Sequence, residues 1–243
     1  VLSPYQAEKV KSFNDADFTD VSHGEIDTTK PYRYNIKCRN GKTIDLFFYN
    51  AQISQAVAFE ELLKDGGRFV EKLKTGISPA NDFSRLVNIA TDGESYGHHT
   101  KFGDMALAYV LRIKAGDEGF TITNYGEYLE KHPPVDEVVI KPVSSWSCCH
   151  GVGRWKEDCG CSTGGMAGWN QKWRKPLREA LDNLRDKLVV LTENEGKKYF
   201  NDVWQARNNY IDVVLNRNNI DKFLKENAFK NLDEKEIVNA LKL

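Results

Sequence analysis

The chain has 243 residues, which is enough for one large domain or a domain with an appendage. Its 34 lysines and arginines nearly balance its 35 aspartates and glutamates, so neither a nucleic-acid partner nor an acidic solvating tail is indicated. The sequence shows no apolar stretch of membrane-spanning length and no signal peptide, so we expect a cytoplasmic protein with no membrane partner.

Strand and helix patterns alternate over residues 1–142. Ser3-Pro4 indicates a helix start over residues 5–10, and Asn40-Gly41 indicates a hairpin turn between strands at 33–38 and 43–49. Apolar spacing and capping residues then predict further helices and strands. The helices are expected at 55–64, 68–74, 104–114 and 125–131, and the strands at 85–91, 120–123 and 135–141.

The remaining residues change character twice. Residues 143–169 are rich in Gly, Ser, Cys and Trp without any period, which predicts a long irregular loop of the kind that often carries function. Residues 170–243 are helical throughout, with apolar stripes that could pack as a small bundle. We therefore divide the chain into an α/β part (1–142), a Cys/Trp-rich loop (143–169) and a helical region (170–243).

A cluster of titratable side chains follows the predicted strand at 85–91. The apolar run ends in Asp92-Gly93-Glu94, and Tyr96 and the pair His98-His99 come directly after it. Residues just past a buried strand of an α/β fold lie where ligands bind. Two carboxylates beside aromatic side chains suit glycosidic bond cleavage, whereas the alternative is a solvated Asp-Gly turn. We call residues 91–99 the acid segment.

Two histidines near two carboxylates also raise the question of a metal site. Adjacent residues such as His98 and His99 point apart in a strand and lie about 100° apart on a helix, so both rarely bind one ion. We therefore expect them to hydrogen-bond a ligand or to pack at a helix start.

Four of the five cysteines fall within fourteen positions of the Cys/Trp-rich loop. An odd cysteine count without an export signal favours reduced thiols over a disulfide scaffold. Cys148, His150, Cys159 and Cys161 form a Cys₃His set that could hold a structural zinc, although their C-x-H and C-x-C spacings are tighter than usual. The alternative is a set of buried reduced thiols.

Tryptophans concentrate in and beside the same loop. We expect one or two of them to lie at the surface of a cleft, where an indole ring can stack on a sugar. The four residues are Trp146, Trp155, Trp169 and Trp173.

Several segments together resemble family-57 glycoside hydrolases, in particular a bacterial subgroup whose barrel runs into a C-terminal extension of uncharacterised function. The strongest part is Ala90-Thr91-Asp92-Gly93-Glu94, which resembles the acid motif of the family. The resemblance covers nearly the whole chain. Its other segments are residues 3–7, 45–49, 53–54, 58–59 and 124–129, then Ser145-Trp146 with Trp155 and Trp169, and residues 204–211.

The resemblance implies an α/β fold, namely the C-terminal portion of an incomplete (β/α)7 barrel followed by a helical bundle. It implies a retaining mechanism on an α-glucan polysaccharide or oligosaccharide, with Asp92 as acid/base and with no cofactor required for the chemistry. The nucleophilic Glu would lie on a strand upstream of Val1, in a missing N-terminal barrel portion, so we expect the isolated chain to be inactive. Sugar binding would fall to Glu94, Tyr96, His98, His99 and Trp146.

Two other classes of function remain open from the sequence. One is a non-catalytic, zinc-stabilised carbohydrate-binding or assembly module in which Asp92 only binds. The other is a metal-dependent polysaccharide deacetylase-like enzyme that uses Asp92, His98 and His99.

Overall fold

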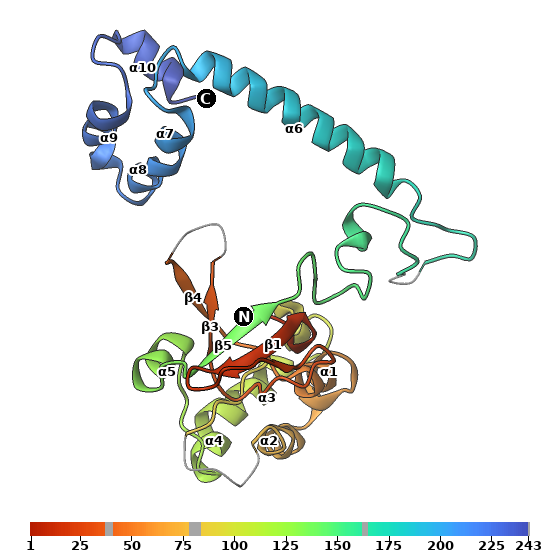
Figure 1. The fold of residues 1–243 in the computed structure, drawn as a ribbon. Helices are drawn as coiled ribbons and strands as arrows, with labels where there is room; N and C mark the ends of the chain where they lie inside the picture. The colour runs from red at the N-terminus through yellow and green to blue at the C-terminus, as the bar shows by residue number, and fades with distance from the viewer. Residues whose placement is uncertain (37–40, 78–83, 162–164, 243) are drawn as a thin grey trace. The chain divides into compact units, whose positions relative to one another are not determined.

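The computed structural model describes residues 1–36, 41–77, 84–161 and 165–242 of the chain. The chain forms two compact units, Val1–Val152 and Gly153–Leu243 (Figure 1). The first unit combines a five-stranded sheet with several helices, and the second is helical. In the described ranges, no helix is both long and apolar enough to span a membrane.

The sheet of the first unit is mixed, with strand order β2-β1-β5-β3-β4. β1 pairs antiparallel with β2 and β5, β3 pairs antiparallel with β4, and β3 runs parallel to β5. The β3–β4 pair confirms the predicted hairpin, although residues 37–40 of its turn lie outside the described residues. The strands are β1 (Ala7–Ser12), β2 (Thr19–Asp20), β3 (Tyr32–Asn35), β4 (Thr43–Leu46) and β5 (Asp136–Ile140).

The helix expected after Ser3-Pro4 is wrong. Only the 3₁₀ turn η1 (Pro4–Gln6) forms, and the chain then continues as β1. Ala7 is fully buried, and β1 pairs with β5 from Ala7↔Ile140 to Ser12↔Asp136. This pairing with a distant strand overrides the local helix-start signal.

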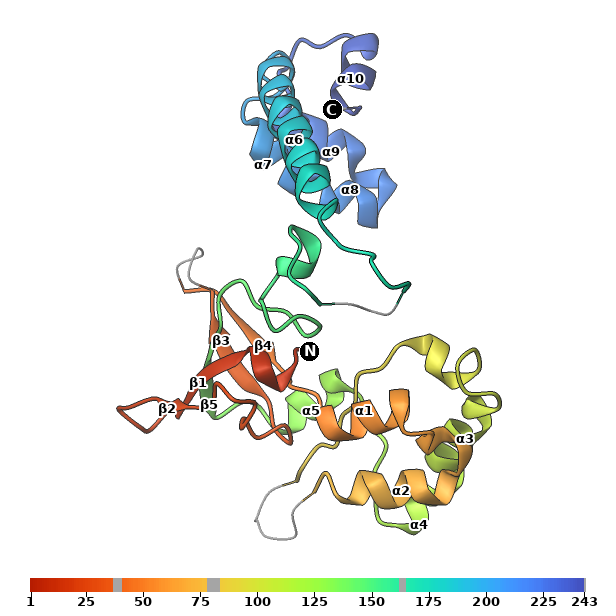
Figure 2. The same ribbon diagram turned by 90° about the vertical axis from the view of Figure 1, so that its right-hand side faces the viewer.

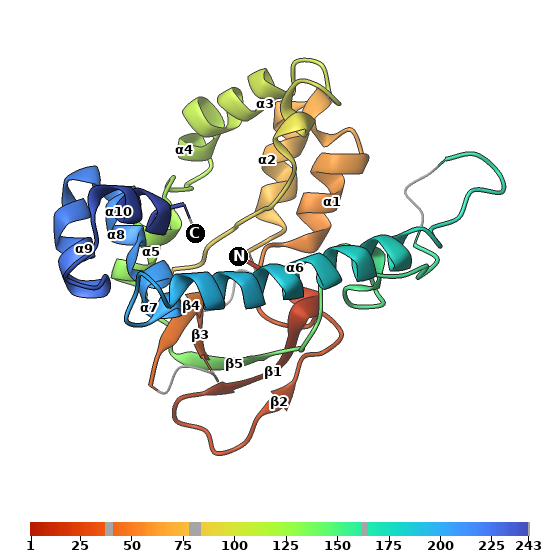
Figure 3. The same ribbon diagram turned by 90° about the horizontal axis from the view of Figure 1, so that it is seen from above.

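Helices α1–α4 lie on one side of the strands (Figures 2 and 3). Asp65 starts α2 because its Oδ1 accepts hydrogen bonds from the backbone N–H groups of Gly67 and Arg68. The helices predicted near 55–64, 68–74, 104–114 and 125–131 all have counterparts. These elements are α1 (Ala51–Phe59), η2 (Leu62–Lys64), α2 (Gly66–Lys74), α3 (Gly103–Tyr109), the π-helix η4 (Val110–Lys114), α4 (Ala115–Asp117) and α5 (Tyr125–Lys131).

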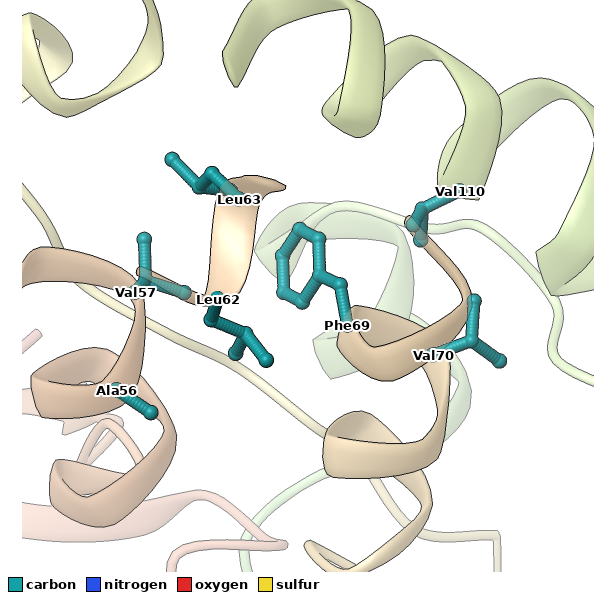
Figure 4. Packing of buried hydrophobic residues seen from close by; sticks show 7 residues of the cluster. All are labelled: Ala56, Val57, Leu62, Leu63, Phe69, Val70 and Val110. Atoms are coloured by element: carbon teal, nitrogen blue, oxygen red, sulfur yellow. The ribbon is translucent and has the colours of Figure 1, made fainter. Parts of the chain in front are cut away.

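Two apolar clusters hold the first unit together. One joins the helices, and Figure 4 shows Phe69 of α2 lying between the leucines of η2 and Val110 of η4. The other packs against the sheet, where Tyr32 and Phe48 meet edge to face with ring centroids 5.7 Å apart. Full burial of such side chains stabilises the fold by about 1.5–3 kcal/mol each.

The second unit has its own small core, built around Phe200 and Phe223. Its short helices supply that core, whereas the leucines along the long helix α6 are about half exposed. The predicted bundle of all the helical stripes therefore stays a prediction. The elements are η5 (Gly153–Trp155), α6 (Arg174–Gly196), α7 (Val203–Asn209), α8 (Ile211–Leu215), η6 (Arg217–Asn219), α9 (Ile220–Asn227) and α10 (Glu234–Ala240).

Candidate active site

The chain leading to the acid segment is extended but forms no strand within its described residues, 84–92. Loops and side chains supply its partners in place of a sheet ladder. The Leu86 N–H donates to Thr29 O at 2.9 Å, and the Ala90 N–H donates to Ser54 Oγ at 3.1 Å. The strand expected at 85–91 is therefore wrong as secondary structure, and so is the strand expected at 120–123, because neither stretch forms a strand or a bridge.

Asn88 anchors this extended chain from inside the unit. Its side chain is 8 % exposed, and its Nδ2 donates to Thr28 O at 3.0 Å and to Phe48 O at 3.2 Å. Its Oδ1 accepts the Tyr125 hydroxyl at 3.2 Å, and its backbone carbonyl accepts the Asn50 N–H at 2.9 Å. Asn88, through its side-chain amide and its backbone carbonyl, thus ties the chain leading to the acid segment to the start of α1, to α5 and to the chain after β4. Sequence reasoning missed Asn88 because nothing in its immediate neighbours marks these contacts.

Burial also changes the pKa values of two tyrosines of α5, Tyr125 and Tyr128. Burial raises the pKa of Tyr125 above its ordinary value, and burial, with a smaller contribution from Asp27, raises the pKa of Tyr128. The Tyr128 hydroxyl donates to Ser84 O at 2.8 Å, at the start of the extended chain. Both hydroxyls therefore stay protonated as hydrogen-bond donors.

Asp92 stands at the first turn of the acid segment. It precedes the 3₁₀ helix η3 (Gly93–Tyr96), and its backbone carbonyl accepts the Ser95 N–H at 3.1 Å. An aspartate in this position usually caps the helix with its side chain, but the Asp92 side chain makes no capping hydrogen bond and is exposed. Its carboxylate is therefore available to a ligand.

The other predicted residues of the acid segment fall into two groups. Tyr96 is half buried, and its hydroxyl hydrogen-bonds that of Thr91 at 3.0 Å across the turn. Glu94, His98 and His99 are exposed, and the Glu94 carbonyl accepts the backbone N–H groups of both histidines. The two imidazole rings meet edge to face with centroids 5.0 Å apart. Backbone hydrogen bonds thus gather these side chains on one short loop.

Trp146 lies on a different loop of the same unit and is 67 % exposed. The neighbouring Ser144 holds this loop, because its Oγ donates to Lys141 O at 2.8 Å and its carbonyl accepts Gln6 Nε2 at 3.4 Å. Within the described residues, no hydrogen bond, ion pair or ring contact joins Trp146 to the acid segment. The indole face is available, but its place beside Asp92 stays a prediction.

A cavity of about 620 Å³ lies beneath the acid segment, between α2, the α3–η4 helix and α5. Apolar side chains such as Phe69, Ile89 and Val110 form most of its lining, and Tyr96 reaches it from the acid segment. Polar side chains such as Thr123, Glu127 and His132 also line it, so the cavity offers hydrogen-bonding groups beside its apolar surface.

The Cys/Trp-rich loop gathers the four predicted metal ligands. Each of Cys148, His150, Cys159 and Cys161 offers one ligand atom, and all four atoms lie within 4.8 Å of one another. Within the parts of the chain that the structure describes, this is the one group of three or more His, Cys, Asp or Glu residues with such spacing. Asp92, His98 and His99 form no comparable group there.

Comparison with known protein families adds two matches. Residues 13–141, more than half of the chain, match the family model described as glycosyl hydrolase family 57. Residues 169–243 match a model described as a domain of unknown function (DUF3536). No curated protein and no solved structure matches the chain.

Proposed function

Because the chain belongs to glycosyl hydrolase family 57, we propose that Asp92 is the acid/base carboxylate of a retaining glycoside hydrolase or transglycosylase acting on an α-glucan. The observation that carries the proposal is the family match across the acid segment, where the Asp92 carboxylate is exposed and makes no capping bond. The chemistry requires no cofactor.

Asp92 would act twice in one turnover. It first donates its proton to the glycosidic oxygen of the leaving sugar, and it then takes a proton from the water or sugar hydroxyl that attacks the glycosyl-enzyme. A residue with both roles must reach the ligand and must be held in place. Exposure of the side chain meets the first need, and anchoring of the preceding chain by Asn88 and Ser54 meets the second.

The remaining predicted residues receive supporting roles. Glu94, His98 and His99 would bind sugar hydroxyls, since all three are exposed on the loop that follows Asp92. Tyr96 would hold the turn through its bond to Thr91 and present its ring to the ligand. Trp146 would stack on a sugar ring, in keeping with its exposed indole.

We also propose that the first unit is a portion of an incomplete (β/α)7 barrel. Leu2 and Phe48 form a parallel bridge, and the Asn50 N–H joins the next extended segment at Asn88. The segments around Leu2, Phe48 and Asn88 thus lie next to one another in that order. Along the chain, α1 and α2 connect the second of these segments to the third. The whole chain would then consist of the α/β part (1–142), the Cys/Trp-rich loop (143–169) and the helical region (170–243).

The exchange Asp92→Asn in the full-length gene product tests the function. We expect loss of turnover on a soluble α-glucan by about 10²–10⁴-fold, the usual contribution of a general acid/base, with unchanged glucan binding. Asp104→Asn is the matched control, because Asp104 is also exposed in the same unit, and it should keep full activity. Equal activity of wild type and Asp92→Asn would refute the role.

Binding separates this function from the other classes. Loss of glucan binding by Asp92→Asn, from a protein that shows no turnover before the exchange, would favour the carbohydrate-binding module. The deacetylase-like enzyme is disfavoured because Asp92, His98 and His99 form no metal-ligand group among the described residues. Among the described residues, the group that could hold a metal is the cysteine cluster.

A further inference from the structure

We propose that Cys148, His150, Cys159 and Cys161 bind one zinc ion that holds the 148–161 loop in shape. The distances support this directly. Ligand atoms about 2.3 Å from a tetrahedral zinc lie about 3.8 Å from one another. The four ligand atoms here all lie within 4.8 Å, so side-chain adjustments of up to about an ångström complete the shell.

The donor set selects the ion. Thiolate and imidazole groups favour zinc over magnesium and calcium, which prefer oxygen ligands. Four protein ligands leave no open position for water or substrate, so the site is structural rather than catalytic. The proposal is therefore independent of the glycosidase chemistry assigned to Asp92.

Local turns bring the first two ligands together. The Gly151 N–H donates to Cys148 O at 3.1 Å, and the Gly151 carbonyl accepts the Ser145 hydroxyl at 2.6 Å. Gly151 has a φ of +70°, and a Cβ there would lie 2.4 Å from Val143 O, so the turn requires glycine.

The other two ligands are held by the residues that follow them. Gln171 donates through its backbone N–H to Asp158 Oδ1 at 3.2 Å and through its side-chain amide to the carbonyl of Cys161. Between the two ligand pairs, the 3₁₀ helix η5 is closed by Lys156 N–H donating to Gly153 O at 3.0 Å. Hydrogen bonds thus shape both arms of the loop around the cluster.

The loop also needs such a ligand to be stable. Of residues 143–161, all of which are described, only Cys148 and Gly153 are buried, so the loop has almost no apolar core. A segment without a core holds one shape only if covalent or metal links supply the missing free energy. Cys148 is 5 % exposed, and it would place one zinc ligand on the protein side of the site.

Cys149 provides a matched control beside the site. It is exposed and lies outside the group of four, although its Sγ is 3.5 Å from His150 Nδ1. A serine at this position removes a thiol from the same loop without removing a proposed ligand. Cys149→Ser and Cys161→Ser therefore make the same chemical change in the same loop, but only Cys161→Ser is predicted to weaken zinc binding.

The test is zinc content and affinity of the full chain purified under reducing conditions. We expect about one tightly held zinc per chain, and cobalt substitution should give the intense thiolate-to-metal absorption of a tetrahedral sulfur-rich site. Cys161→Ser should weaken zinc binding by more than the roughly 100-fold that loss of an outer-shell partner can cost, and Cys149→Ser should leave it unchanged.

Three results would overturn the proposal. They are a reduced wild-type chain that takes up no zinc, equal loss of zinc from Cys149→Ser and Cys161→Ser, and a disulfide between two of the four residues in the native protein.

A further measurement uses only the wild-type chain, so it does not depend on the folding of any variant. Stripping zinc from the wild type with a chelator should change the fluorescence of the loop tryptophans and expose the thiols to a thiol reagent, and no change in either would also count against the site.

Discussion

The exchange Asn88→Ala should destabilise the first unit by about 3 kcal/mol. The side chain makes three hydrogen bonds, to Thr28 O, to Phe48 O and from the Tyr125 hydroxyl, and it is 8 % exposed. Each bond contributes about 1 kcal/mol net, and alanine leaves the partners buried without replacement. The exchange Tyr125→Phe removes one of the three bonds but keeps the ring against Phe47, so it should cost about 1 kcal/mol.

Urea unfolding of the two single variants and of the double variant measures this network. Once Asn88 is alanine, Tyr125→Phe has no bond left to remove, so the double-mutant cycle should give a coupling of about 1 kcal/mol. Hydrogen exchange of residues 84–92 assigns the loss to the first unit and should be faster in Asn88→Ala. A smaller loss for Asn88→Ala than for Tyr125→Phe, or a coupling near zero, would refute the idea that this amide anchors the acid segment.

Three further expectations concern the loop, the buried tyrosines and a helix cap. Gly151→Ala should weaken zinc binding in a metal competition assay, because its Cβ would meet Val143 O at 2.4 Å, and unchanged affinity would contradict the turn geometry. Burial raises the pKa of Tyr125 and of Tyr128 above 10.0 in the folded state, so folding keeps protons that the unfolded chain loses. Stability should therefore be fully present below about pH 10 and fall as the pH rises further, less steeply in Tyr128→Phe, and equal slopes in alkaline urea titrations would contradict this. Asp65→Ala should cost about 1 kcal/mol by removing the cap of α2, as read from urea midpoints, and an unchanged midpoint would show that the cap contributes nothing.

Elements with local signals could be predicted from the sequence. α5 forms at Tyr125–Lys131 as expected, because Asn124 Oδ1 accepts the Glu127 N–H at its start and Pro133 follows its end. The four cysteine-loop ligands could be proposed for the same reason, since they lie within fourteen positions of the chain. A pattern that lies within one short stretch of the chain needs no distant partner, so it predicts the structure of that stretch.

The strand predicted at 135–141 also forms, as β5 (Asp136–Ile140), but segments whose local pattern conflicts with their distant partners could not be predicted. The Ser3-Pro4 helix start gives way to β1, whose partner β5 lies more than a hundred residues later. The apolar run at 85–91 resembles a strand, but its backbone and Asn88 bond to loops and to Ser54 rather than to a ladder. The pattern of one segment carries no information about such partners, so the anchor of the acid segment emerged only with the fold.

The dependence of Asp92 variants on the leaving group tests the central claim most directly. Asp92→Ala should slow formation of the glycosyl-enzyme by about 10²–10⁴-fold on an α-glucan, whose sugar leaving group needs a proton, but little on an α-glucosyl fluoride, whose fluoride needs none. Turnover of the fluoride should then stall at the glycosyl-enzyme, because Asp92 no longer activates the attacking water. Added azide should restore turnover on the fluoride by replacing the water that Asp92 no longer activates. Equal slowing of glycosyl-enzyme formation on both substrates, with no rescue of turnover by azide, would contradict the assignment of Asp92 as the acid/base.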